Sequence, residues 1–360
     1  MRIKIGYFTG IFLFAFQLSY AQYIQAYEDF RKYFYVFYNG VSYQLESQPV
    51  QSYVVSSESV LYVDQATNLK AWYKGEKFDL GEGNNLQFNS SNNLISYQRD
   101  QVLYVFDNGK SKRLTSFLKE YVVGNEIIIF KEDNLDILKA YYNREIIDIE
   151  YTLVSKLGSY KVGDNAVAYV NGNGYFKVFS NGETLELEQW EATQFVCGKD
   201  MVGYVDGSTQ NLKLFYKDKV LKLENFPPAS MQMGANIFAY VSDESAFKVY
   251  SNGKLLKVES YAPDFYKVKD NICVFFTENK LQIMLEGTRY ELGNFTPQSY
   301  QISNSNIAWK DNAGRLKMFD KGKVLDVTSE IVSSYSLNGD VLQYIGGDNY
   351  SHIFYRGKNY

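Results

Sequence analysis

Aromatic side chains recur at one position of a repeated pattern, and they are the residues of this sequence best suited to bind a ligand. They open short alternating segments that we expect to be the first strand of each repeat: Tyr53, Tyr121, Tyr160, Phe195, Tyr266, Tyr300 and Tyr335. Aromatic rings offer a large contact area at a low cost in conformational entropy. If the first strands line a common channel, these rings could form a surface for a sugar or an apolar ligand. The alternative is that they only pack one repeat against the next.

Acidic and amide residues mark a second recurring position, in the turn that follows each second strand. They are Asp64, Asp100, Asp133-Asn134, Asn171, Asp206, Asp243-Glu244, Glu278-Asn279, Asp311-Asn312 and Asp348-Asn349. One interpretation is an acidic ring that binds calcium or a cationic partner. We favour the other, because Asp and Asn stabilise tight turns through their own side chains. No segment has the spacing of a calcium loop, so we expect neither a metal site nor a cofactor.

The sequence offers few residues for catalysis. His352 is the single histidine, and Cys197 and Cys273 are the only cysteines. This composition excludes the usual multi-histidine or cysteine metal sites, and it argues against Ser-His-Asp and Cys-His arrangements. We expect the two cysteines to be small buried hydrophobes without a disulfide. Carboxylate chemistry, as in glycoside hydrolysis, needs only a spaced pair of acids; it stays open as an alternative, although we expect a protein that is not an enzyme.

A repeat of about 35 residues positions all of these side chains. Its clearest copy, Tyr160 to Glu188, reads as four short strands, with Asn181-Gly182 between the third and the fourth. Asn-Gly between alternating segments is typical of a β-hairpin, because both central residues of a type I′ turn need positive φ. The hairpin position recurs at intervals of 34 to 38 residues, at Gly40, Gly75, Gly109, Arg144, Gly182, Asp218, Gly253, Gly287, Gly322 and Gly357. At Arg144 and Asp218, which lack glycine, we expect longer or differently twisted turns.

Two further columns share this register. Every complete unit has an aromatic residue in its second strand, which we expect in the core: Tyr62, Tyr97, Phe130, Tyr169, Tyr204, Tyr240, Phe275, Trp309 and Tyr344. A lysine recurs in the third strand, at Lys70, Lys139, Lys177, Lys213, Lys248 and Lys317. Because it alternates with apolar neighbours, we expect its aliphatic stem to cover an outer sheet face.

The order of the units predicts a closed ring. Nine units are complete or nearly so, and a partial unit from Tyr33 to Leu45 supplies a hairpin before them. The last unit stops soon after Gly357, so the N-terminal segment could provide the strand that the last unit lacks. The prediction is an all-β fold: a β-propeller of about nine short four-stranded blades, closed by its N- and C-terminal strands. In architecture the pattern resembles TolB-like and WD-like propellers, but it lacks the Trp-Asp and Gly-His pairs of WD repeats, so the resemblance implies a fold and no functional residues.

Residues 1–21 have the features of a signal peptide, which leaves residues 22–360 as the propeller domain. Arg2 and Lys4 precede an apolar stretch that is too short to span a bilayer, and Ser19-Tyr20-Ala21 forms a small-x-small cleavage signal. The junction before Gln22 resembles those of exported proteins of Bacteroidota-type bacteria. We therefore expect a secreted or periplasmic protein.

Charge narrows the choice of partners. Without residues 1–21 the chain has 35 basic and 41 acidic residues, a formal charge of −6, and no basic cluster. This argues against nucleic acid and anionic lipid surfaces as partners, and no later apolar run suggests membrane insertion. We predict a non-catalytic exported propeller that binds an extracellular or periplasmic protein or glycan on the face bearing the inter-blade loops. The alternatives are a carbohydrate-active hydrolase or lyase that uses channel carboxylates, and a scaffold for envelope assembly.

Overall fold

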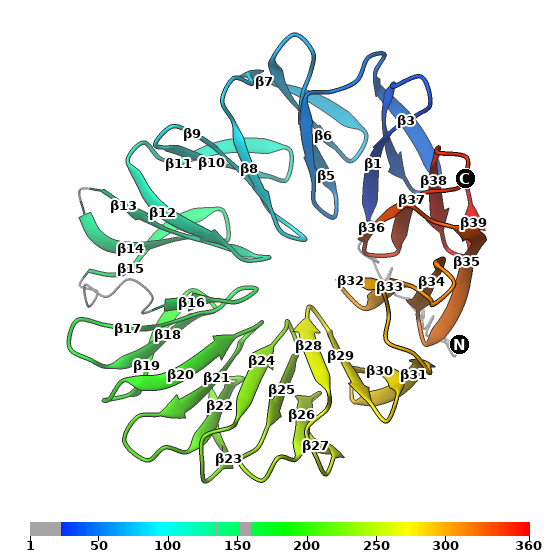
Figure 1. Ribbon diagram of the computed structural model, residues 1–360. Helices are drawn as coiled ribbons and strands as arrows, with labels where there is room; N and C mark the ends of the chain where they lie inside the picture. The colour runs from blue at the N-terminus through cyan, green and yellow to red at the C-terminus, as the bar shows by residue number, and fades with distance from the viewer. Residues whose placement is uncertain (1–22, 134, 152–159) are drawn as a thin grey trace, which may run out of the picture.

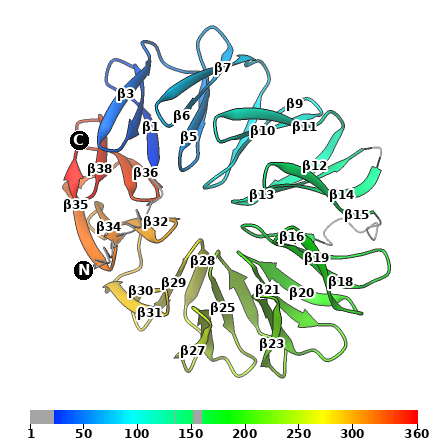
Figure 2. The same cartoon turned by 180° about the vertical axis from the view of Figure 1, so that it is seen from behind.

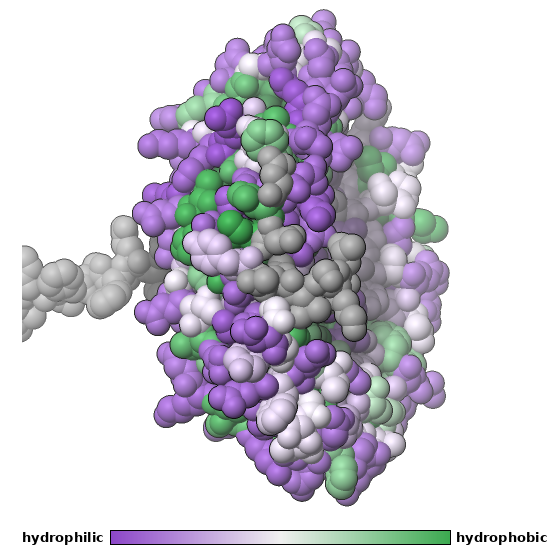
Figure 3. All heavy atoms as spheres, turned by 90° about the vertical axis from the view of Figure 1, so that its left-hand side faces the viewer, coloured by the Kyte–Doolittle hydropathy of each residue, from purple (hydrophilic) through white to green (hydrophobic). Residues whose placement is uncertain are grey.

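A computed structural model of the chain describes residues 23–133, 135–151 and 160–360. Within them, 39 strands form ten antiparallel sheets around a ring (Figure 1), which confirms the all-β propeller. From the side the molecule is a flattened disc with apolar residues scattered over a mostly hydrophilic surface (Figure 3). In these residues we find no helix that is long and apolar enough to cross a bilayer. The predicted signal peptide lies outside the described residues.

We number the sheets as blades 1 to 10 in chain order. Blade 1 has the three strands β1 (Ile24–Glu28), β2 (Phe34–Tyr38) and β3 (Val41–Glu46). Blade 2 has β4 (Ser52–Val55), β5 (Ser59–Val63), β6 (Asn68–Tyr73) and β7 (Glu76–Glu82), and blade 3 has β8 (Gln87–Ser90), β9 (Ile95–Arg99), β10 (Val102–Asp107) and β11 (Lys110–Thr115). Blade 4 has β12 (Leu118–Val123), β13 (Ile127–Glu132), β14 (Leu135–Tyr142) and β15 (Glu145–Glu150), and blade 5 has β16 (Tyr160–Val162), β17 (Val167–Val170), β18 (Phe176–Ser180) and β19 (Glu183–Glu188).

Blades 6 to 10 each have four strands. Blade 6 has β20 (Ala192–Cys197), β21 (Met201–Asp206), β22 (Leu212–Tyr216) and β23 (Lys219–Glu224), and blade 7 has β24 (Ser230–Met233), β25 (Ile237–Val241), β26 (Phe247–Ser251) and β27 (Lys254–Glu259). Blade 8 has β28 (Phe265–Lys269), β29 (Ile272–Thr277), β30 (Lys280–Leu285) and β31 (Thr288–Gly293), and blade 9 has β32 (Ser299–Ser303), β33 (Asn306–Lys310), β34 (Arg315–Asp320) and β35 (Lys323–Ile331). Blade 10 has β36 (Ser334–Asn338), β37 (Val341–Ile345), β38 (Ser351–Tyr355) and β39 (Lys358–Asn359).

The propeller has ten blades rather than about nine. The additional blade is the N-terminal unit, in which β1 pairs with β2 and completes a three-stranded sheet with β3. The repeat pattern in the sequence predicted only a hairpin for this unit. A signal for β1 was present, because Tyr27 lies 35 residues before Tyr62 and continues the aromatic column of the second strands.

The ring closes without the strand exchange predicted from the sequence. The C-terminal β39 pairs with β38 of its own blade, and β1 to β3 form a separate sheet. Blades 1 and 10 instead pack side by side, as both ribbon views show (Figures 1 and 2). Phe37 contacts the rings of Tyr355 and Tyr360, with centroids 5.5 and 5.1 Å away, and Asn338 Nδ2 donates to the carbonyl oxygen of Ile24 at 2.8 Å. This junction therefore depends on side-chain packing, as the other blade junctions do.

The hairpins between third and fourth strands have the positive φ angles that the sequence predicts. Asn39 and Gly40 have φ of 53° and 80°. The expectation of different turns at Arg144 and Asp218 is wrong: each is the second residue of a two-residue turn like the others, with φ of 67° and 59°. Asp tolerates this left-handed conformation better than most residues, whereas Arg has no such preference.

The core lies between blades. The second-strand aromatic residues are all buried there, as predicted. Both cysteines are free thiols, as predicted, but only Cys273 is a buried residue, and Cys197 is intermediate in exposure. Burial raises the pKa of the Cys197 thiol to about 12, so this thiol stays protonated at neutral pH.

A belt of hydrogen bonds joins the turns between first and second strands. The amides of Glu126 and Asp164 donate to the carbonyl oxygens of Asp164 and Gly198 at 2.7 and 3.0 Å, and the amide of Lys199 donates to Ala235 at 2.8 Å. These turns approach closely because glycine opens four of them: Gly124, Gly163, Gly198 and Gly234. At each of the four, a Cβ atom would lie closer than 3.0 Å to a backbone oxygen of the next turn. At these four positions glycine is required because a side chain would leave no room for the neighbouring turn, and not because the backbone needs a positive φ angle.

Candidate functional site

The seven aromatic residues singled out from the sequence lie on the innermost strands, spread around the ring. Six of them pack against the hydrophobic clusters between blades: Tyr121, Tyr160, Phe195, Tyr266, Tyr300 and Tyr335. Tyr53 is 41% exposed and lines a cavity of about 510 Å³ in the middle of the ring, together with Asn92, Asp270 and Asn338.

These rings contact the preceding blade rather than one another. Tyr53 lies 5.1 Å from Phe34 between ring centroids, and the same separation joins Phe195 to Phe176 and Tyr266 to Phe247. The described ring contacts include none between two of the seven. Their packing favours a role in blade contacts, and ligand binding by individual rings stays a prediction.

The acidic residues after the second strands mostly stabilise their own turns. Asp64 Oδ1 accepts a hydrogen bond from the amide of Asn68 at 2.8 Å, and Asp311 Oδ1 accepts one from the amide of Arg315 at 3.0 Å. In residues 23–133, 135–151 and 160–360, no group of three or more His, Cys, Asp or Glu side chains is placed to hold a metal ion. His352 stacks on Tyr344 and bonds to Asp348 in the same blade.

Four of the six third-strand lysines make ion pairs across blade junctions, which corrects the expectation that they cover outer faces. Lys213 Nζ lies 2.6 Å from Glu188 Oε1 of the preceding blade and 2.7 Å from Asp206 Oδ2 of its own blade. Tyr204 donates its hydroxyl proton to the same Glu188 oxygen at 2.7 Å. The corresponding cross-blade pairs are Lys70–Glu46, Lys177–Glu150 and Lys248–Glu224. Lys139 and Lys317 pair within their own blades.

Because of these ion pairs, we expect the unfolding free energy of the protein to decrease at acidic pH. Burial alone would raise the pKa of Asp206, but hydrogen bonds from Lys213, Thr209 and backbone amides lower the pKa to about 2, below the ordinary 3.8. The contribution of Asp206 to stability is therefore complete above about pH 5 and decreases as the pH falls through 3.8 towards 2. We expect Asp206→Asn to lose at most about 2 kcal/mol of unfolding free energy at pH 6, and roughly half as much at pH 3. Urea unfolding at both pH values tests this; a pH-independent difference would contradict it.

Carboxylate and amide side chains meet in the middle of the ring, where the turns between first and second strands converge. Asn92 Nδ2 in blade 3 donates to Asp270 Oδ1 in blade 8 at 3.1 Å, so this bond spans the ring. Burial raises the pKa of the Asp164 carboxyl to about 6; a hydrogen bond with Asn125 opposes this, and the charges of Asp270 and Glu126 reinforce it. The central channel is thus narrowed by polar side chains at the belt.

A set of exposed aromatic residues was missed in the sequence. Four lie in connections between blades and two in turns between second and third strands. We call them the loop aromatics: Phe30, Phe117, Trp190, Phe226, Tyr261 and Tyr350. All six lie at the same end of the blades, because in an up-and-down sheet these two kinds of connection share one face. Trp190 is 58% exposed and Phe226 59% exposed. An aromatic residue follows the fourth strand in blades 3 to 8, and this recurrence was a usable signal: Phe117, Tyr151, Trp190, Phe226, Tyr261 and Phe295.

Local contacts fix several of these loops. The carbonyl oxygen of Phe117 accepts a hydrogen bond from the amide of Asp133 at 2.8 Å, which ties the connection to a neighbouring turn. Phe226 precedes Pro227-Pro228, whose φ angles are restricted. The rings of Phe30 and Tyr350 lie 5.9 Å apart across the junction of blades 1 and 10. Local contacts or restricted backbone angles thus hold four of the six loop aromatics in place: Phe30, Phe117, Phe226 and Tyr350.

Comparison with known proteins found solved structures of low similarity and one matching family model. Similar solved structures include the computationally designed Ika8 protein (16% identity, TM-score 0.35, covering 74% of this chain and 95% of that chain) and human WBSCR16 (10%, 0.35, 67% and 90%). The tricorn protease is also similar (11%, 0.32, 91% and 44%). Likeness at these TM-scores supports no inference about function. The sequence matches no curated protein. Residues 18–360 match the model of the 10-bladed beta propeller domain, and the chain belongs to this family.

Proposed function

We propose that this protein is a non-catalytic exported propeller that binds a protein partner through the face bearing the inter-blade loops. The propeller fold supports a binding or scaffold role in general. The observation that carries the proposal is the set of loop aromatics, because Tyr, Trp and Phe are enriched in protein interfaces. Export is supported by the signal-like residues 1–21.

A protein partner fits this face better than a glycan. Four cavities of about 140 to 560 Å³ are lined by none of the loop aromatics, whereas small ligands usually need a concave site. Exposed acids on the same face include Asp133, Asp243 and Glu244. We therefore infer a partner whose contact surface is apolar with basic residues around it.

We also propose that the protein is not an enzyme. The carboxylates nearest the channel are engaged in the fold: Asp270 accepts hydrogen bonds from Asn92 and from the amide of Asn304, and Glu126 pairs with Lys199. A hydrolase or lyase would need two acids free to reach a substrate. Turnover of a bound glycan that is lost in Asp164→Asn would overturn this part of the proposal.

The test replaces Trp190 and Phe226 together by serine. The matched control replaces Val220 and Leu255, which are also exposed but follow hairpins at the opposite end of the blades. A partner captured from the cell envelope or medium is identified, purified and titrated against each variant by calorimetry.

We expect the Trp190/Phe226 variant to bind at least tenfold more weakly, because truncation of aromatic hot spots costs about 2 kcal/mol or more. The control should bind like the parent protein, and both variants should keep their melting temperature. Equal affinity of the parent and the Trp190/Phe226 variant would exclude this face. Retention of the partner at high salt would contradict the basic surface that we infer for it.

A further inference from the structure

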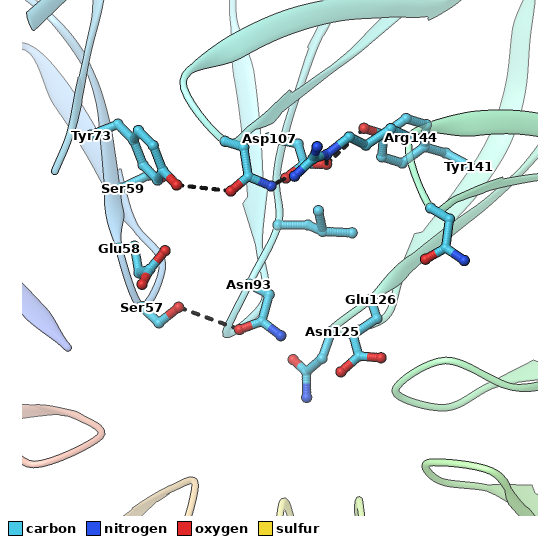
Figure 4. A pocket seen from close by; sticks show the side chains of 13 residues that line it. Ser57, Glu58, Ser59, Tyr73, Asn93, Asp107, Asn125, Glu126, Tyr141 and Arg144 are labelled. Carbon is cyan, nitrogen blue, oxygen red and sulfur yellow. Dashed lines mark hydrogen bonds and ion pairs between the residues drawn. The ribbon is translucent and has the colours of Figure 1, made fainter. Parts of the chain in front are cut away.

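A cleft of about 560 Å³ opens at the other end of the blades, away from the loop aromatics (Figure 4). It is built from turns of blades 2, 3 and 4, which follow first and third strands. Tyr73 comes from blade 2, Asn93 and Asp107 from blade 3, and Tyr141 and Arg144 from blade 4. Its volume is in the range of small-molecule binding sites.

The repeat is broken at this cleft. Eight of the ten hairpin positions hold glycine, but here Arg144 has φ of 67°, a conformation that is costly for a residue with a Cβ atom. Arg144 directs its guanidinium towards the cleft, with Nε 3.8 Å from Asp107 Oδ2. The other exception, Asp218, lines neither this cleft nor the other three cavities described above. A residue that is unfavourable for the turn, and that faces a cavity, indicates a role beyond the fold.

A hydrogen-bond network fixes the wall of the cleft across three blades. Tyr73 donates its hydroxyl proton to Asn108 Oδ1 at 2.8 Å, and Asn108 Nδ2 donates to Asp107 Oδ1 at 2.7 Å. Tyr141 donates to Asp107 Oδ2, also at 2.8 Å. Burial and the adjacent Asp107 raise the pKa of the Tyr141 phenol, so it remains a donor. The donors and acceptors are thus in place before a ligand arrives.

Each acid that lines the cleft has a basic partner. Besides Asp107 with Arg144, Glu58 lies 2.8 Å from Lys74 and Glu126 lies 2.5 Å from Lys199. An anion or a cation would have to compete with one of these pairs. The remaining lining side chains are amides, hydroxyls, two phenol rings and the aliphatic Leu94. The polar majority of this set suits a neutral ligand that carries many hydroxyl groups.

We propose that this cleft binds a short neutral oligosaccharide, with Arg144, Asp107 and the neighbouring amides as hydrogen-bond partners. This site is separate from the protein-binding face and does not rest on it.

The decisive variant is Arg144→Gly, which restores the consensus of the repeat. We expect it to be at least as stable as the parent protein, because glycine accepts the left-handed φ, yet to lose at least tenfold in affinity for the sugar. The matched control is Asp218→Gly, which makes the same correction in a hairpin outside the cleft and should bind like the parent. Asp107→Asn should also weaken binding, since it removes the charged acceptor.

The purified protein is screened on an array of neutral and acidic glycans, and the best neutral oligosaccharide is titrated by calorimetry against all four proteins. Saturable binding that is lost in Arg144→Gly and retained in Asp218→Gly supports the proposal. Absence of binding to every neutral glycan, exclusive binding of acidic glycans, or equal affinity of Arg144→Gly and the parent would overturn it. Because Trp190 and Phe226 lie on the opposite face, loss of partner binding in their variant leaves this result unaffected.

Discussion

Replacement of Gly198 by alanine is expected to destabilise the protein by about 3 kcal/mol, because overpacking of a closely packed site has costs of this order. A Cβ atom at this position would lie closer than 3.0 Å to the carbonyl oxygen of Gly234. That oxygen belongs to the backbone of the next belt turn and cannot move aside as a flexible side chain would. The turns must separate, and the hydrogen bond from the amide of Lys199 to Ala235 weakens with them.

A hairpin glycine provides the control for this prediction. Gly253 has φ of 76°, and a Cβ atom there would meet nothing within 4 Å. Gly253→Ala should therefore cost only about 1 kcal/mol, the price of the left-handed conformation. Urea unfolding followed by tryptophan fluorescence compares the two variants. If both variants lose the same unfolding free energy, the close approach of the turns in the belt makes no special contribution to stability.

Removal of the Glu188 carboxylate should cost about 3 kcal/mol, because it takes away one of the two carboxylates that contact the Lys213 ammonium and leaves the Tyr204 hydroxyl without its acceptor. Glu188 accepts both the Lys213 ammonium and the Tyr204 hydroxyl at a blade junction, and its side chain is only 16% exposed. Glu188→Ala should thus lower the urea midpoint clearly at pH 7. The double variant Glu188→Met with Lys213→Met should not recover the loss, because it leaves the buried Asp206 carboxylate without the Lys213 ammonium.

Asp326 is the matched control for Glu188. It also pairs with a third-strand lysine, Lys317, at 2.8 Å, but its side chain is 80% exposed. Asp326→Ala should change the unfolding free energy by less than about 1 kcal/mol, as exposed ion pairs do. A comparable loss in both variants would show that the position in the repeat, rather than burial at the junction, determines the contribution.

At the junction between blades 7 and 8, a different basic residue forms the corresponding ion pair. Its third strand has Gln282 in place of lysine, and Arg289 from the adjacent fourth strand takes over the charge. Arg289 Nη2 lies 2.6 Å from Glu259 of the preceding blade, and Nε donates to Gln282 Oε1 at 2.5 Å. A basic group against the preceding carboxylate is thus kept although the residue that supplies it changes.

The sequence determined the features of this protein that depend on local rules. Strand alternation and Asn-Gly hairpins specify four short strands per repeat, since both follow from φ preferences and from the period of two in a strand. The second-strand aromatic residues were correctly assigned to the core because a strand that is apolar on both faces must lie between two neighbours. The burial of Cys273 follows from the same register, whereas Cys197 is only partly buried.

The tertiary structure decided what each blade places against the next. Periodicity gives the face on which Lys213 lies but not the Glu188 carboxylate that meets it, and it cannot show that Gly198 is needed for room between turns. The closure of the ring depends on whether Phe37 packs on Tyr355 or a strand is exchanged, a balance of packing and pairing that no single repeat encodes. The loop aromatics gather at one end of the blades and the turns around the Arg144 cleft at the other end, and both groupings form only when the ten sheets close into a ring.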